Sequence, residues 1–110
     1  MDDSAIIDLY FARSEKAIQE TGVKYGNYLH TIAENILHTQ EDSEEAVNDT
    51  YLAAWNAMPP TRPRVLRHFL SRIVRNLCLL RTAIEQNYGK IYRAFQYDLK
   101  NLHTLPEYIP

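Results

Sequence analysis

Residues 42–77 read DSEEAVNDTYLAAWNAMPPTRPRVLRHFLSRIVRNL, and this stretch decides the fold. It joins an acidic segment to an arginine-rich segment through a loop that contains prolines. In both segments apolar side chains recur every three or four residues, which is the spacing of an amphipathic α-helix. The stretch therefore predicts two consecutive helices of opposite charge, each with one apolar side for a shared core.

The acidic helix is predicted to start at Asp42-Ser43-Glu44-Glu45, which has the form of a capping box with acids near the positive helix N-terminus. It must end at Pro59-Pro60, because a proline disfavours helix at the residue before it. Its apolar side carries Val47, Tyr51, Ala54, Trp55 and Met58. On the opposite side an exposed stripe is predicted, which either binds a partner or is only a solvated helix face: Glu45, Asn48, Asp49 and Leu52.

The second helix is predicted from about Arg64 into the low eighties, and residues 61–81 contain six arginines, one histidine and no acid. At about 100° per residue, one side of it is cationic and the other apolar. The cationic side carries Arg64, Arg67, His68, Ser71, Arg72 and Arg75, and the apolar side carries Leu66, Phe69, Leu70, Ile73, Leu77 and Leu80. Because guanidinium groups bind phosphates through paired hydrogen bonds and stack on bases, the cationic side is a candidate nucleic-acid surface. The alternative is a solvated basic face neutralised by the acidic helix.

The rest of the chain also reads as helices, without sustained strand-like alternation. One helix is expected from Ser4 to Ala12 with Asp3 or Ser4 as cap, and the next from a Ser14 cap to Leu37, before a polar turn at Thr39–Glu41. Gly22 and Gly26 lie inside the second pattern, so a break near Thr21-Gly22 is an alternative. A fifth helix is predicted from apolar residues between Tyr88 and Leu102. The prediction is an all-α, compact bundle of four to five helices.

Composition sets further bounds. The 110 residues are 45% hydrophobic, enough for one core, and the net charge of −2 hides a strong asymmetry. Residues 1–60 carry eleven acids and three bases, a net −8, whereas residues 61–110 carry nine bases and three acids, a net +6. Cys78, the single cysteine, is expected in the core, and its isolation is typical of a reducing, cytoplasmic setting. No apolar run approaches the roughly 20 residues of a membrane span, and the start lacks the features of a secretory signal.

Catalytic and metal-binding patterns are missing from the sequence. His30, His38, His68 and His103 form no i, i+4 pair and no HExxH arrangement. Neither GxGxxG nor GxxxxGK occurs, so no nucleotide cofactor is expected. We therefore expect a binding module with no cofactor and no metal, and not an enzyme.

The order of these features resembles region 2 of sigma-70-family RNA polymerase sigma factors, in particular the extracytoplasmic-function type. The resemblance rests on Asp42-Ser43-Glu44-Glu45-Ala46-Val47-Asn48-Asp49-Thr50-Tyr51-Leu52-Ala53-Ala54-Trp55 and on Phe69-Leu70-Ser71-Arg72-Ile73-Val74-Arg75-Asn76-Leu77. It covers about residues 14–81. It implies a transcription initiation module that acts on core RNA polymerase and promoter DNA.

The resemblance divides the work between the two charged helices. The acidic helix of that family docks on the coiled coil of the polymerase β′ subunit, which implies polymerase contacts for Asp42, Glu45, Asn48, Asp49 and Leu52. The loop and the basic helix of that family capture and open the −10 promoter element. They imply DNA contacts for Arg62, Arg64, Arg67, His68, Ser71, Arg72, Arg75 and Asn76. An anti-sigma factor is a further candidate partner.

The chain also departs from the family pattern. Members usually continue into a strongly basic stretch and a second helical domain that reads the −35 element, whereas Leu79-Leu80-Arg81-Thr82-Ala83-Ile84-Glu85 follows here. We predict a region 2-like domain over residues 1–84 and an additional helix and tail over residues 85–110. Two alternatives remain: a protein-interaction module that binds polymerase or a regulator without promoter recognition, and a structural domain that self-associates through its opposite charges.

Overall fold

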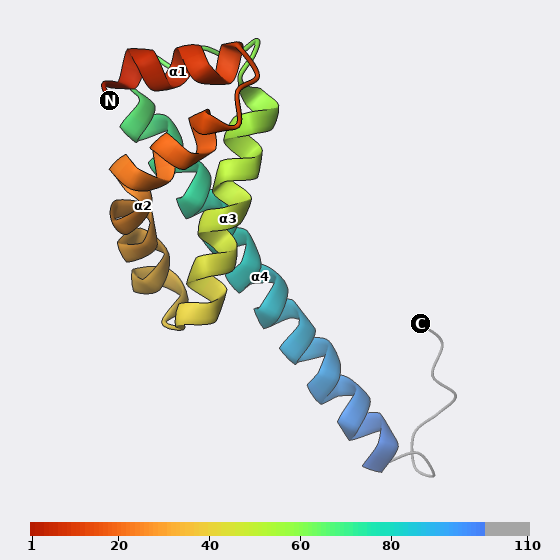
Figure 1. Cartoon of the computed structure of the whole chain (residues 1–110). Coiled ribbons are helices and arrows are strands. Elements are labelled where there is room, and N and C mark those ends of the chain that lie inside the picture. Colours follow the sequence, from red (N-terminus) through yellow and green to blue (C-terminus); the bar gives the residue numbers. More distant parts are fainter. Residues whose placement is uncertain (101–110) are drawn as a thin grey trace. The chain divides into compact units, whose positions relative to one another are not determined.

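The computed structural model describes the backbone of residues 1–100 and the side chains of residues 1–88. This part of the chain forms four helices and no strand (Figure 1). The helices are α1 (Asp3–Phe11), α2 (Lys16–Leu37), α3 (Gln40–Ala57) and α4 (Leu66–Lys100). The predicted all-α class is confirmed.

The chain divides into two compact units, Met1–Leu80 and Arg81–Pro110. In the first unit, α2 and α3 form an antiparallel hairpin, and α1 lies across the end where α2 begins and α3 ends (Figure 1). The second unit begins inside α4, where Arg81 Nε lies 3.6 Å from Glu85 Oε1 one turn further along. The predicted domain boundary after residue 84 stays a prediction.

The predicted separation of a fourth and a fifth helix was wrong, because α4 runs without a break from Leu66 to Lys100. No proline lies between Pro63 and Pro106, and one glycine inside the helix, Gly89, costs only about 1 kcal/mol. Nothing in the sequence therefore ends the helix in the low eighties. The apolar residues from Ile91 to Leu102 that suggested a fifth helix lie outside the residues whose side chains are described.

The alternative break near Thr21-Gly22 does not occur, since α2 is continuous. Both glycines instead face Tyr51 of α3. A Cβ atom added at Gly22 would lie 3.5 Å from the Tyr51 hydroxyl oxygen, and one at Gly26 would lie 3.3 Å from it. The glycines therefore let α2 and α3 approach closely around the end of this tyrosine.

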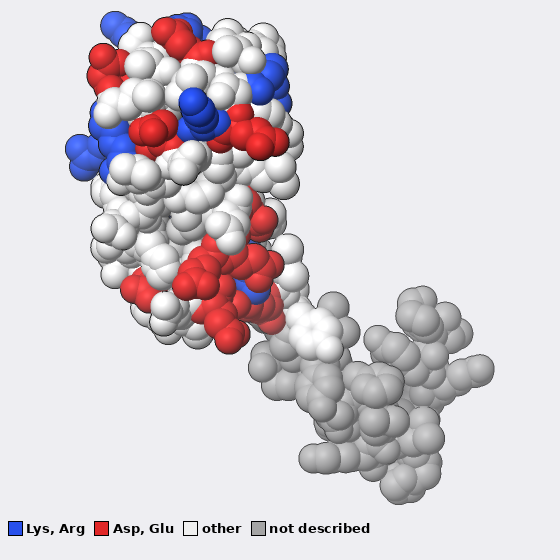
Figure 2. Space-filling model, in the orientation of Figure 1, with Lys and Arg blue, Asp and Glu red and all other residues white. Residues whose placement is uncertain are grey.

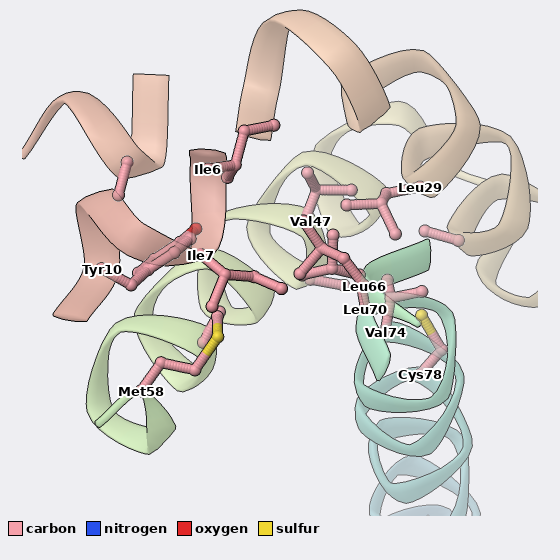
Figure 3. Close-up of a cluster of buried hydrophobic side chains, with 14 residues drawn as sticks. Ile6, Ile7, Tyr10, Leu29, Val47, Met58, Leu66, Leu70, Val74 and Cys78 are labelled. Carbon is pink, nitrogen blue, oxygen red and sulfur yellow. The ribbon is translucent and has the colours of Figure 1, made fainter. Parts of the chain in front are cut away.

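All four helices contribute side chains to one core, as predicted for their apolar sides (Figure 3). The buried apolar residues of α4 follow one another at four-residue steps: Leu66, Leu70, Val74 and Cys78. Leu80 was expected among them but is 58% exposed, because it lies two residues, or about 200° of rotation, beyond Cys78. None of the described helices has the length and apolar character needed to cross a membrane.

Three predicted helix caps were wrong. Ser14 does not cap α2, because the N-cap position is Glu15, whose side chain accepts no capping hydrogen bond. Asp2, not Asp3 or Ser4, caps α1, and its carboxylate accepts a hydrogen bond of 2.8 Å from the Ala5 amide. The α3 helix starts at Gln40 and not at Asp42, since the Thr39 hydroxyl accepts from the Asp42 amide at 3.3 Å. Ser43 is buried and donates to the Thr39 carbonyl at 2.6 Å. Residues 39–42 also have the form of a Thr cap followed by an acid, so the cap pattern occurs twice, and α3 uses the first of the two.

We predict that His38→Gly stabilises the protein by about 1 kcal/mol. His38 ends α2 in the left-handed conformation (φ 63°), which is unfavourable for a residue with a Cβ atom and easy for glycine. The side chain is exposed, so little packing is lost. Urea unfolding followed by circular dichroism measures the change, and unchanged or reduced stability would contradict it.

Candidate protein and nucleic-acid interfaces

The exposed side of α3 forms an acidic face, which we define as Asp42, Glu45, Asn48, Asp49 and Leu52. Asp42 is half-buried and the other four residues are exposed, as the helical spacing predicted. The opposite side of α3 is fixed in the core by Ala46, Val47, Thr50 and Ala54. Figure 2 shows acidic side chains gathered near the end of the hairpin where α2 passes into α3. The core thus holds the acidic face towards solvent.

An apolar hollow of about 510 Å³ adjoins the Leu52 end of the acidic face. Ile18 and Gln19 from α2 line it together with Leu52 and Trp55 from α3, and Glu15 stands at its rim. Leu52 itself is 57% exposed. Sequence reasoning missed this hollow, because it depends on how two helices pack and not on the pattern within either one. The surface can accept both a cationic group and an apolar side chain.

The exposed side of α4 forms an arginine surface together with Arg64, which lies two residues before the helix. We define this surface as Arg64, Arg67, His68, Arg72, Arg75 and Asn76. All six residues are exposed, while the other side of the helix is buried through Leu66, Leu70, Val74 and Cys78. Among the described residues, Arg64, Arg72 and Arg75 form no ion pair. Their guanidinium groups are therefore available for phosphate.

Ser71 was predicted to be part of the same surface, but it is only 7% exposed. Its hydroxyl donates to the His68 carbonyl at 3.1 Å. Ser71 lies at the edge of the core side of α4, about 100° from Leu70, and its small side chain is covered there. We therefore leave Ser71 out of the candidate nucleic-acid surface.

Two of the predicted DNA contacts are already engaged within the protein. Arg62 lies 3.0 Å from an Asp8 carboxylate oxygen and 5.3 Å from the centre of the Phe11 ring. Arg67 lies 4.7 Å from the centre of the Tyr28 ring. The Arg62–Asp8 pair is largely exposed, so it stabilises the fold by at most about 1 kcal/mol. Arg62 is thus attached to α1, while Arg67 remains at the border of the arginine surface.

A hollow of about 370 Å³ lies within the arginine surface. Arg64, His68 and Arg72 supply its polar groups, and its apolar lining comes from Pro63, Val65 and Phe69. This combination suits an unstacked base, which presents a flat apolar face and polar edges next to a negatively charged backbone. The hollow draws on both the loop and α4, which is why only the fold shows it.

Arg13 contacts the end of α3, which the sequence did not suggest. It follows α1 in the left-handed conformation (φ 56°), which costs about 1 kcal/mol for a residue other than glycine. Its guanidinium donates to the carbonyl oxygens of Trp55 at 2.8 Å and Met58 at 2.6 Å and lies 3.7 Å from the centre of the Trp55 ring. These contacts satisfy carbonyl groups at the end of α3 and tie it to the turn between α1 and α2.

The start of α1 is held on α2 by a carboxylate–phenol contact. The Tyr25 hydroxyl donates to both Asp3 carboxylate oxygens, at 2.8 and 2.9 Å, and Lys24 Nζ lies 2.8 Å from one of them. Burial, and then the hydrogen bond to Asp3, raises the pKa of Tyr25 to about 12. Burial alone would raise the pKa of Asp3, but the hydrogen bonds from Lys24 and Tyr25 outweigh it and the pKa is lowered.

We predict that Asp3→Asn moves the pKa of Tyr25 from about 12 towards the ordinary phenol value of about 10. A phenol whose pKa is raised by folding stabilises the protein fully below about pH 10, and this contribution is lost as the pH rises through about 12. Removing the carboxylate should therefore lower the stability at neutral pH and make the further loss of stability between about pH 10 and 12 smaller. Titration of ¹³C-labelled tyrosines by NMR measures the pKa, with Tyr25→Phe identifying the signal. An unchanged late-titrating tyrosine would contradict the prediction.

Comparison with known proteins identifies the family of the chain. The family model described as Sigma-70 region 2 matches residues 23–82, more than half of the chain. The protein therefore belongs to the sigma-70 region 2 family. No curated protein and no solved structure matches the chain.

Family membership supports a sigma-factor-like role in RNA polymerase interaction and promoter recognition, and region 2 is a non-enzymatic domain of transcription factors. The match includes the last part of α2, all of α3, the loop and the first part of α4. Both the acidic face and the arginine surface lie within it. The α1 helix and the first turns of α2 lie outside it.

Proposed function

We propose that this protein is a transcription initiation module of the extracytoplasmic-function type, which binds the β′ coiled coil of core RNA polymerase and −10 promoter DNA. The observation that carries the proposal is the placement of two oppositely charged surfaces on consecutive helices. The acidic face and the arginine surface each lie opposite a buried side, and both fall inside the match to the sigma-70 region 2 family.

The acidic face is proposed to receive a basic partner helix. Glu45 and Asp49 are one turn apart on α3, and Leu52 beside the 510 Å³ hollow offers an apolar contact. Interfaces of this kind combine an apolar centre with a charged rim, and the rim charges guide association. A coiled coil that carries Lys or Arg beside an apolar side chain fits both parts.

The arginine surface is proposed to bind the non-template strand of an opened −10 element. Arg72 and Arg75 reach phosphates, while the 370 Å³ hollow between Arg64, His68 and Phe69 holds an unstacked base. Affinity for duplex DNA alone should be low, because the net charge is −2 and the acidic helix repels phosphate. DNA binding is therefore expected mainly in the presence of polymerase.

Reciprocal charge reversals test the proposal. Arg72→Glu with Arg75→Glu should weaken binding of a −10 non-template oligonucleotide to the polymerase complex by at least about 100-fold, since a hydrogen bond to a charged group contributes roughly 1.5–3 kcal/mol. The dependence of log affinity on log salt should become shallower by about 0.7 for each lost phosphate contact. Polymerase binding should be unchanged. Lys16→Glu, which reverses one exposed base on α2, controls for charge reversal outside the arginine surface.

The opposite variant, Glu45→Arg with Asp49→Arg, should reduce binding to core polymerase by at least about 10-fold while leaving helix content unchanged. Glu34→Arg, which reverses one exposed acid on α2, controls for charge reversal outside the acidic face. Surface plasmon resonance with immobilised core polymerase measures the first step, and fluorescence anisotropy of the oligonucleotide measures the second. If neither double variant differs from its control, the proposed function is wrong. If only the acidic variant has an effect and the wild-type complex does not bind DNA, the protein is a polymerase-binding module without promoter recognition.

A further inference from the structure

The loop between α3 and α4, residues 58–65, contacts the α1 segment, which we define as residues 2–13, at two places. At its beginning, Arg13 donates to the Met58 carbonyl at 2.6 Å. Further along, Arg62 Nη2 lies 3.0 Å from Asp8 Oδ1. Residues of both segments, together with Leu66 of α4, also line a common hollow of about 270 Å³. The α1 segment supplies Asp3, Ser4 and Ile7, and the loop supplies Arg62, Pro63, Arg64 and Val65.

These contacts fix the position of the loop and add little to the buried core. Asp8, Arg13 and Arg62 are all exposed, and each connects α1 or its following turn to a residue at or beyond the end of α3. Arg13 also keeps the left-handed backbone conformation that positions its side chain over Trp55. Unfavourable backbone conformations persist where surrounding contacts hold them, and they are frequent at functional sites. The arrangement indicates a role in fixing the loop.

We propose that the α1 segment is a clamp for the loop, and that Arg13 and Arg62 are positioning residues and not DNA ligands. For its effect on DNA, the clamp rests on the proposed function of the arginine surface. The α1 segment precedes the residues matched by the family model, 23–82, so the match itself assigns it no role.

A fixed loop matters for the 370 Å³ hollow of the arginine surface. Pro63, Arg64 and Val65 belong to the loop, and they line the hollow together with His68, Phe69 and Arg72 of α4. If the loop were released, these two groups of residues would no longer keep a constant spacing. Binding would then have to order the loop, which reduces affinity. The clamp therefore pre-organises the hollow, while the acidic face on α3 is left unchanged.

A charge exchange distinguishes a clamp from a direct DNA contact. Arg62→Asp should weaken binding of the −10 oligonucleotide to the polymerase complex about 10-fold, through repulsion from Asp8. The double variant Asp8→Arg with Arg62→Asp restores the ion pair with reversed polarity and leaves the net charge unchanged. It should bind within about twofold of the wild type. If Arg62 contacts DNA itself, the double variant stays as weak as Arg62→Asp, and the proposal is wrong for this residue.

Amide hydrogen exchange tests the clamp without DNA. The Thr61 amide donates to the Ala57 carbonyl at 2.9 Å, so its protection reports the order of the loop. Exchange of Thr61 should accelerate at least about 10-fold in Arg13→Gln and in Arg62→Asp, and it should return to the wild-type rate in the charge exchange. Emission of Trp55, the single tryptophan, should also change in Arg13→Gln.

Ala33→Gly controls for general destabilisation, since it weakens the interior of α2 and removes none of the hydrogen bonds or ion pairs of the clamp. It should leave the exchange of Thr61 and the emission of Trp55 unchanged. Unaltered Thr61 exchange in both arginine variants would overturn the clamp whether or not the protein binds DNA. If exchange of Thr61 accelerates in these variants but the complex of polymerase and wild-type protein does not bind DNA, the clamp is kept and the proposed function is rejected.

Discussion

Burial of one side of α3 and one side of α4 in the same core is the constraint on which the rest of the structure depends. Leu70 and Val74 can be buried only if Arg72 and Arg75 turn to solvent, and Val47 and Ala54 place the same requirement on Glu45 and Asp49. Because of helical geometry, burying the apolar side of each helix exposes the opposite, charged side, and two charged surfaces result. The acids lie on α3 and the arginines lie on α4, so the two kinds of charge form separate surfaces and do not neutralise each other in one cluster.

This constraint also explains how much could be predicted from the sequence. The acidic face and most of the arginine surface follow from rotation about single helices, so residue spacing was enough to find them. Ser71 shows the limit of that reasoning. Its angle places it between the two sides of α4, and only the packing of neighbouring helices decides that its hydroxyl is covered and bonded to the His68 carbonyl.

Features that depend on contacts between distant parts of the chain could not be predicted. Arg13 and Trp55 are far apart in the sequence, and no local pattern indicates that a residue in the turn after α1 binds the carbonyl groups at the end of α3. The engagement of Arg62 by Asp8 is hidden for the same reason, so composition alone made Arg62 look like another phosphate ligand. The continuous α4 is a different case. No stop signal lies within this helix, and the lack of a signal predicts a helix end less well than a proline or a capping residue does.

The proposed function requires that the protein brings promoter DNA to core RNA polymerase. The most direct measurement is the affinity of a labelled −10 non-template oligonucleotide for core polymerase, with and without the protein, at several salt concentrations. The account predicts that polymerase and protein together bind the oligonucleotide much more tightly than either does alone, and that the affinity falls steeply with salt. An affinity that does not rise when the protein is added to core polymerase would contradict it.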